Sequence, residues 1–289
     1  MAAARELGDV ELVSVDSMQV YRGMDIGTAK PTGAERAEVR HHLVDLVEPS
    51  EDFTVAEFQR AHTEALADIA ARGRRAVLVG GTGLYHRAVI DGLELPGEWP
   101  AVRRRLEREA DECGPEELHA RLTAVDPTAA ARMEPTNRRR IVRALEVVEG
   151  SGRPFSSFGP GLDAYPMSAV TQIGVRWDRP VLADRVERRV RTMIAEGLVD
   201  EVASILADRG LSRSANQALG YKEIVDHLEG RVGLDEAIEQ IVVRTRQFAV
   251  RQLRWFGRDP RVCWVDVEDD PVAEVTPVLL RALAEASAA

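Results

Sequence analysis

The sequence predicts an α/β fold in which helices flank a parallel sheet and an all-helical segment is inserted. Two apolar runs rich in β-branched residues, 10–16 and 75–81, enclose residues 54–74, whose apolar positions recur with helical spacing. Strand, helix and strand in this order are typical of a βαβ unit, because parallel neighbours need a long crossover. The first half of the chain therefore predicts a parallel sheet.

The middle of the chain changes character and then returns to the first pattern. Residues 95–161 contain short helical segments separated by proline and glycine, with no strand candidate. Strand-like runs resume at 169–177 and 261–267, together with long helical patterns at 180–208 and 234–258. We therefore assign 1–94 and 162–289 to one α/β core and 95–161 to a helical insertion.

Composition limits the cellular setting and the classes of site. Cys113 and Cys263 lie far apart and outside any Cys/His cluster, which argues against a disulfide framework and a zinc site. No uncharged apolar run is long enough to span a bilayer, and we expect a cytoplasmic protein that does not bind membranes. The net charge of -10 argues against indiscriminate coating of nucleic acid, although it leaves local basic patches open.

Polar residues follow two of the predicted strands at their carboxyl ends. Asp16 ends the first strand, and the sequence GGTG, residues 80–83, ends another. Ligands of open parallel sheets bind beyond these ends, so we expect both segments to face one crevice. Backbone N–H groups and the Thr82 hydroxyl could bind an anion such as a diphosphate there. The alternatives are a tight turn without a ligand at GGTG and a helix cap or Asx turn at Asp16.

Six segments carry a resemblance to a known family across nearly the whole chain. They are SVDSMQVYRGMDIGTAKP (14–31), HHLVD (41–45), LVGGTGLY (78–85), RRIVRALEV (139–147), ALGYKE (218–223) and RTRQFAVRQLRWF (244–256). Their order and spacing resemble the motifs of the tRNA dimethylallyltransferases, also called tRNA isopentenyltransferases. The resemblance implies a P-loop-type α/β core, with an insertion that helps to hold the anticodon stem-loop.

The same resemblance implies a reaction. The exocyclic amine of the adenosine 3′ of the anticodon takes a dimethylallyl group from dimethylallyl diphosphate, with Mg²⁺ as cofactor. An adenine amine is a poor nucleophile, so a carboxylate that accepts its proton is valuable, and Asp16 is the expected general base. Thr82, Gly81 and Lys30 are expected to stabilise the diphosphate, and an exposed loop charge is the alternative for Lys30.

The target base must leave its stack, and the residues beside Asp16 are the candidates to hold it. Core packing is the alternative for Met18. Arginine-rich segments supply basic surface, with a solvated helix face as their alternative, while the resemblance favours RNA contact. The residues expected to contact tRNA are Asp16, Ser17, Met18, Gln19, Thr82, Arg103, Arg139, Arg140, Ile141, Val142, Arg143, Gln247 and Arg251. For His41 and His42, packing or capping beside a helix start is favoured over metal binding.

One departure from the family concerns the start of the chain. The resemblance implies a Walker-type loop, GxxxxGK[ST], before the first strand seen here, yet Lys30 follows Ala29 and Lys222 follows Tyr221. We therefore expect the first strand, the P-loop and most of the first helix to be missing from the recorded sequence through a misplaced start codon or a truncated gene model, rather than through an evolved loss. Two alternatives are a catalytically inactive tRNA-binding remnant and an adenylate isopentenyltransferase, which would need neither the insertion nor the arginines. We expect a monomer.

Overall fold

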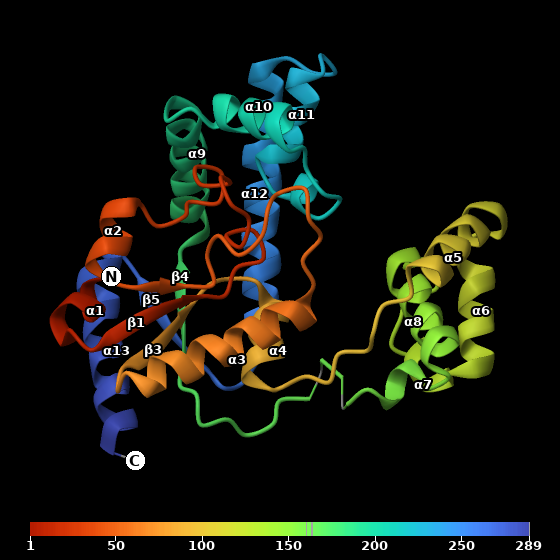
Figure 1. Cartoon of the computed structure of the whole chain (residues 1–289), viewed down its shortest axis with the longest axis horizontal. Helices are drawn as coiled ribbons and strands as arrows, with labels where there is room; N and C mark the ends of the chain where they lie inside the picture. Colours follow the sequence, from red (N-terminus) through yellow and green to blue (C-terminus); the bar gives the residue numbers. More distant parts are fainter. Residues whose placement is uncertain (160, 163, 289) are drawn as a thin grey trace. The chain divides into compact units, whose positions relative to one another are not determined.

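The chain is divided into two compact units, Met1–Ile90 with Met167–Ala289 and Asp91–Pro166 (Figure 1). The sequence places its insertion at 95–161, within the second unit. The structure is a computed structural model and describes residues 1–159, 161–162 and 164–288. None of the helices in these ranges is long and apolar enough to cross a membrane.

Three parallel strands form the first sheet. Its order is β2-β1-β3, with β1 (Val10–Ser14) between β2 (His41–His42) and β3 (Arg75–Val79). The register places Ser14 opposite Val79, so β1 and β3 end together. The sequence did not indicate β2, which has only two residues and follows α2 (Gly33–Glu38). His42 packs inward, as favoured from the sequence, and its Nε2 lies 2.6 Å from Glu11 Oε2.

A second parallel sheet pairs β4 (Gln172–Trp177) with β5 (Val262–Val267). The parallel α/β architecture expected from the sequence is confirmed, but its strands are shared between two sheets. Helix α3 (Val55–Ala71) packs on β1 and β3, and α13 (Pro271–Ala288) packs on β5. A capping box at Thr54 starts α3, because Thr54 Oγ1 accepts from Glu57 N–H while the Glu57 carboxylate accepts from Thr54 N–H.

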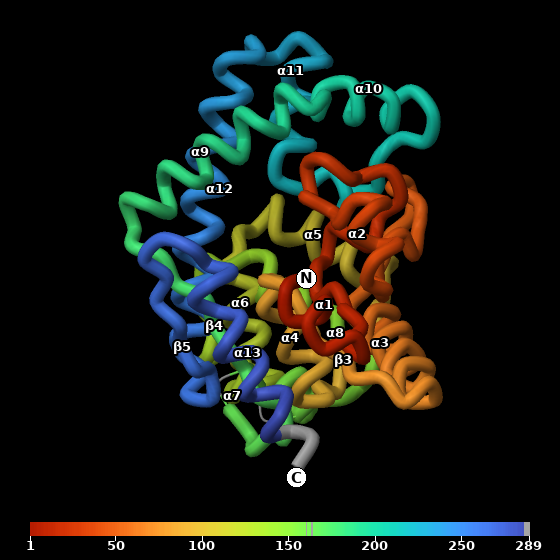
Figure 2. Tube along the Cα trace, turned by 90° about the vertical axis from the view of Figure 1, so that its left-hand side faces the viewer, coloured from red at the N-terminus to blue at the C-terminus, as the bar shows by residue number. Residues whose placement is uncertain are grey.

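Long helices complete the first unit. The helix expected over 180–208 is broken at Gly197, whose φ of +102° ends one helix and starts the next. Helix α9 (Arg179–Ala195) lies beside α12 (Leu234–Phe256) in both views (Figures 1 and 2). The other helices of this unit are α1 (Ala2–Leu7), α4 (Gly83–Ile90), α10 (Leu198–Asp208) and α11 (Tyr221–Leu228), with the 3₁₀ turn η2 (Ala215–Gln217).

The second unit is helical and has its own core. Proline begins α5, α6 and α7, where the missing N–H costs nothing. Leu106, Leu122, Ile141 and Leu145 are buried together and hold the helices as one body. Its elements are α5 (Pro100–Cys113), α6 (Pro115–Val125), α7 (Pro127–Ala130), α8 (Arg138–Ser151) and the 3₁₀ turn η1 (Phe155–Ser157).

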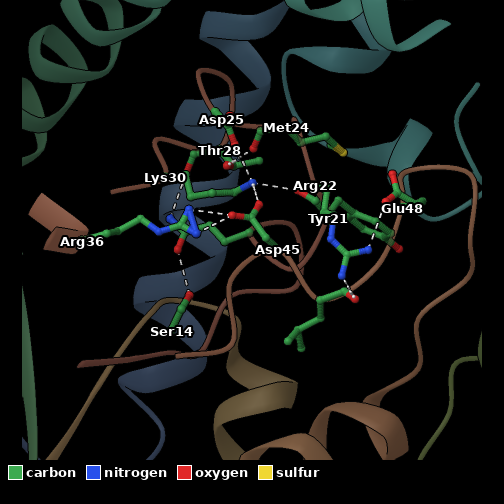
Figure 3. Close-up of polar contacts among 12 residues, drawn as sticks. Ser14, Tyr21, Arg22, Met24, Asp25, Thr28, Lys30, Arg36, Asp45 and Glu48 are labelled. Carbon is green, nitrogen blue, oxygen red and sulfur yellow. Dashed lines mark hydrogen bonds and ion pairs between the residues drawn. The ribbon is translucent and has the colours of Figure 1, made fainter. Parts of the chain in front are cut away.

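The loop that follows β1 is folded around a buried lysine (Figure 3). Lys30 Nζ donates to Tyr21 O (2.7 Å), Asp25 Oδ1 (2.6 Å) and Asp45 Oδ1 (2.7 Å), and only 1% of the side chain is exposed. An ammonium has three donors, so all are used. Arg36 Nη1 holds the second oxygen of Asp45 at 2.6 Å. The prediction that Lys30 binds the diphosphate therefore does not agree with its position.

A second anchor holds the same loop from α10. Glu201 Oε2 accepts from the backbone N–H of Asp25 (3.0 Å) and Ile26 (2.8 Å). Its Oε1 accepts from the Tyr221 hydroxyl at 2.5 Å. A Cβ at Gly27 would overlap the Tyr221 ring, so the backbone approaches the ring as closely as glycine allows. Carboxylate, phenol and ammonium together give the loop one defined conformation.

We predict that Lys30→Met lowers the free energy of unfolding by about 2–4 kcal/mol, because Asp45 and the Tyr21 carbonyl lose a buried charged donor. Lys222→Met is the matched control, since Lys222 has no side-chain partner in the described part of the chain, and it should change stability by less than about 0.5 kcal/mol. Urea unfolding measures both variants. Equal losses would contradict the anchoring role of Lys30.

Candidate functional site

Asp16 follows β1 and opens the turn by which the chain leaves the sheet. Its Oδ1 accepts from the backbone N–H of Met18 (2.7 Å) and Gln19 (3.3 Å). This is an Asx turn, one of the alternatives considered from the sequence. The other oxygen, Oδ2, has no hydrogen-bond partner among the described residues. One oxygen thus orients the carboxylate, and the second is available to a ligand.

Thr82 lies beside this turn, directly before α4. Its Oγ1 accepts the backbone N–H of Ser17 at 3.2 Å and lies 3.5 Å from Ser17 Oγ. The parallel register of β1 and β3 accounts for the meeting, since both strands end at one edge of the sheet. The Thr82 hydroxyl donates its own hydrogen to Ser17 Oγ, but at 3.5 Å this bond is long and weak, so a ligand with a better acceptor can replace it. Asp16 and Thr82 therefore form one polar site.

The glycines around Thr82 are explained by close packing. A Cβ at Gly80 would overlap Val15 O, one at Gly81 would overlap Gln252 Nε2, and one at Gly83 would overlap the Trp255 indole. At Gly80 and Gly83 the overlap is with backbone and a ring, which leaves no room for a side chain, whereas at Gly81 it is with the end of the Gln252 side chain, which would have to move away. The absence of side chains therefore does not by itself indicate an anion site. Gly81 keeps its assignment to the diphosphate only as a prediction.

The side chains of Met18 and Gln19, expected to hold the target base, make contacts within the protein. Gln19 Oε1 accepts from Ser14 Oγ at 2.8 Å, and its Nε2 donates to the carbonyls of Thr28 (3.1 Å) and Ala29 (3.3 Å). Both amide hydrogens are thus used within the loop, which does not agree with Gln19 holding a base through them. Met18 is partly buried against the main core, as its packing alternative requires.

A buried phenol lies near Asp16. Tyr85, on α4, stacks at a tilt on Phe58 with ring centroids 4.7 Å apart. Burial raises the pKa of the Tyr85 hydroxyl, and the charges of Tyr21 and Asp16 raise it further. The phenol therefore stays protonated at neutral pH, near the carboxylates of Asp16 and Glu57.

The residues here do not make a magnesium site by themselves. No group of three or more His, Cys, Asp or Glu side chains within the described ranges could hold a metal ion. Mg²⁺ is usually bound through one or two carboxylates together with substrate phosphates, and this site offers a single open carboxylate oxygen, at Asp16.

Helix α12 carries an exposed cationic surface. Gln247 and Arg251 are exposed, and the Arg251 guanidinium lies 5.7 Å from the ring centroid of Phe248. Arg244, at the start of the segment RTRQFAVRQLRWF, is half-buried in an ion pair with the buried Glu223. The exposed arginines that follow, and for which the described residues offer no partner, are Arg254 and Arg258.

Helix α8 carries four neighbouring residues expected to contact tRNA, of which two are exposed and two are buried. Arg139 and Arg140 are exposed and have no ion-pair partner in the described part of the chain. Ile141 and Val142 are buried in the core of the helical unit, which does not agree with contacts from these side chains to tRNA. At about 100° per residue, a four-residue run must cross from one face of a helix to the other.

Arg103 and Arg143 are engaged with a buried carboxylate. Glu146 Oε2 lies 2.8 Å from Arg103 Nε and 3.0 Å from Arg143 Nη1, while its Oε1 accepts from Trp99 N–H at 2.7 Å. Each arginine remains partly exposed. Both side chains therefore support the helical unit, and their contact with tRNA stays a prediction.

Two groups that shape the site were missed from the sequence. Gln252 Nε2 donates to the carbonyl of Gly81 at 2.9 Å, and Glu201 holds the loop after β1. Each acts across more than 150 positions of sequence, and neither lies in a pattern that specifies its partner. The motifs gave only a partial signal: RTRQFAVRQLRWF contains Gln252, and ALGYKE contains Tyr221, the hydrogen-bond partner of Glu201.

Comparisons with known proteins agree with this architecture. The IPP transferase family model matches residues 19–259. A tRNA dimethylallyltransferase from a Nocardioides species is 51% identical over 261 residues, covering 90% of this chain and 84% of the relative. One from Streptomyces coelicolor is 50% identical over 264 residues, covering 91% of this chain and 83% of the relative.

Solved structures extend the comparison. The full-length tRNA isopentenylpyrophosphate transferase from Bacillus halodurans superposes with a TM-score of 0.68 at 42% identity, covering 99% of this chain and 92% of that one. A eukaryotic dimethylallyltransferase acting on tRNA has a TM-score of 0.76 at 23% identity, which shows the fold alone. With the family model spanning most of the chain and relatives half identical along its length, this chain belongs to the IPP transferase family.

Proposed function

We propose that this protein transfers a dimethylallyl group from dimethylallyl diphosphate to the exocyclic amine of the adenosine 3′ of the anticodon in tRNA. Relatives about half identical to it are named tRNA dimethylallyltransferases. The observation that carries the proposal is the free Asp16 oxygen, held in a fixed direction beside the Thr82 hydroxyl at the edge of the sheet.

Asp16 performs the proton transfer. As the amine nitrogen bonds to the allylic carbon, the bond from that carbon to the diphosphate oxygen breaks and its electrons leave with the diphosphate. The nitrogen then carries one proton too many, and Asp16 Oδ2 accepts it. The Met18 N–H on Oδ1 keeps the carboxylate in place during the step, so little reorganisation is needed.

Thr82 acts on the other reactant. Its hydroxyl hydrogen and backbone N–H can donate to the negative charge that develops on the leaving diphosphate. The Ser17 N–H, which donates to Thr82 Oγ1 at 3.2 Å, fixes the hydroxyl oxygen next to the Asp16 turn. Base and leaving-group donor are thereby kept together on two adjoining turns.

Exposed arginines without an ion-pair partner among the described residues bind the RNA. Arg139 and Arg140 on α8, and Arg251 with Gln247 on α12, have side chains available for phosphate contact. Arginine forms bidentate bonds with phosphate, which suits backbone recognition.

The direct test is incorporation of labelled dimethylallyl diphosphate into unmodified tRNA by the full product of the gene. We expect label on the adenosine that follows the anticodon after nuclease digestion. Label on free adenine nucleotide alone would instead identify an adenylate isopentenyltransferase. Binding of tRNA without any transfer, measured with the same preparation, would identify an inactive RNA-binding protein.

Asp16→Asn should lower the single-turnover transfer rate about 10²–10⁴-fold, the range expected when a general base is lost. The amide keeps the shape of the carboxylate and can still accept from Met18 N–H through its oxygen, so affinity for tRNA should change little. A transfer rate near that of the unmodified protein would remove Asp16 from the mechanism.

Replacing Arg139 and Arg140 by Glu should weaken tRNA binding and reduce the salt slope, by about 1 to 2 in the exponent if both contact phosphate. Arg188 and Arg189 form the matched control, an adjacent exposed pair on α9 without partners in the described part of the chain. Affinity measured across a salt series decides the outcome. Equal effects from the two pairs would assign the loss to net charge alone.

A further inference from the structure

The turn that contains Thr82 is rich in glycine and therefore has little conformational preference of its own. Gly80, Gly81 and Gly83 surround Thr82, and glycine has more backbone freedom than any other residue. A reaction that depends on donors aimed within a fraction of an ångström needs such a turn to be fixed from outside. Side chains of α12 lie where that fixing can occur.

Gln252 makes the specific contact. Its Nε2 donates to Gly81 O at 2.9 Å, and a Cβ on Gly81 would overlap the same nitrogen. Trp255, one turn further along α12, packs so closely on Gly83 that a Cβ there would overlap the indole. The turn therefore packs closely on α12, and the hydrogen bond from Gln252 sets the direction of the Gly81–Thr82 peptide group.

We propose that Gln252 is a positioning residue for the transfer reaction, acting through the Gly81–Thr82 peptide on Thr82. This inference rests on the proposed function. In a planar trans peptide, the C=O and N–H point in opposite directions. Gln252 draws Gly81 O toward α12, and the N–H of Thr82 therefore points away from α12.

The hydroxyl of Thr82 is fixed by a different group. Ser17 N–H donates to Thr82 Oγ1 at 3.2 Å, and Ser17 directly follows Asp16. Gln252 and Ser17 together hold the two donors of Thr82, one through the backbone and one through the side chain. Loss of the Gln252 bond releases the Gly81–Thr82 peptide, which has glycine at 80, 81 and 83 around it, so Thr82 N–H is the group expected to lose its direction.

Gln252→Met tests this role, because methionine keeps the length of the side chain and removes the donor. We expect the single-turnover rate at saturating substrates to fall about 10- to 100-fold, with the dissociation constant for tRNA within about twofold and an unchanged melting temperature. The matched control is Gln59→Met, since Gln59 Nε2 donates to Ala88 O at 2.6 Å, at the other end of α4. That control should retain the wild-type rate.

A double-mutant cycle separates positioning from general damage. If Gln252 acts through Thr82, the losses from Gln252→Met and Thr82→Val should combine to less than their product. Full multiplicativity, or a Gln252→Met rate equal to wild type, would overturn the inference.

One further readout does not depend on activity. In protein labelled with ¹⁵N-threonine, Gln252→Met should shift the Thr82 amide signal and speed its hydrogen exchange about 10-fold or more, while Gln59→Met leaves both unchanged. If the wild-type protein transfers no prenyl group, the proposed function is wrong, and this comparison still decides whether Gln252 fixes the turn. An unaltered Thr82 amide in Gln252→Met would reject it.

Discussion

The site depends on the parallel register of β1 and β3. Because Ser14 lies opposite Val79, the two strands end at the same level, and the turns that follow them meet. Asp16 then lies beside Thr82, and a hydrogen bond from Ser17 N–H to Thr82 Oγ1 joins the two turns. Both turns make contacts with groups far away in the sequence, since the loop after β1 closes around the buried Lys30 and the turn before α4 is rich in glycine. The remainder of the first unit supplies the groups that hold them.

Each turn is held by a different set of buried contacts. Lys30 and Glu201 fix the loop after β1: the buried Lys30 ammonium donates to the carbonyl of Tyr21 and to the carboxylates of Asp25 and Asp45, and Glu201 accepts from two backbone N–H groups. Gln252 and Trp255 fix the turn before α4 from a single helix. That helix also carries the exposed Gln247 and Arg251, so one rigid element connects the surface proposed for RNA with the turn proposed for the diphosphate.

The sequence predicted the parts of this arrangement that depend on local pattern. The βαβ unit follows from two β-branched runs around a helical period, and the meeting of Asp16 with the GGTG turn follows from parallel pairing. Lys30 illustrates the limit, because its three acceptors come from positions 21, 25 and 45, and no local pattern distinguishes a lysine inside a loop from one on its surface. Ile141 and Val142 were grouped with their arginine neighbours by motif, although helical periodicity alone would have placed them in the core. The segment RTRQFAVRQLRWF contained Gln252, but nothing in the sequence indicated that its partner is Gly81, 171 positions away.

The central claim is that Asp16 faces the reacting amine. A crystal structure of the protein bound to an anticodon stem-loop RNA would measure the distance between Asp16 Oδ2 and the exocyclic amine of the adenosine that follows the anticodon. If Asp16 is the general base, we expect an extruded base with this distance at about 2.6–3.2 Å, the range in which a general base can take the proton. A base still stacked in the loop, or an amine that faces another side chain while Asp16 Oδ2 faces solvent, would contradict it.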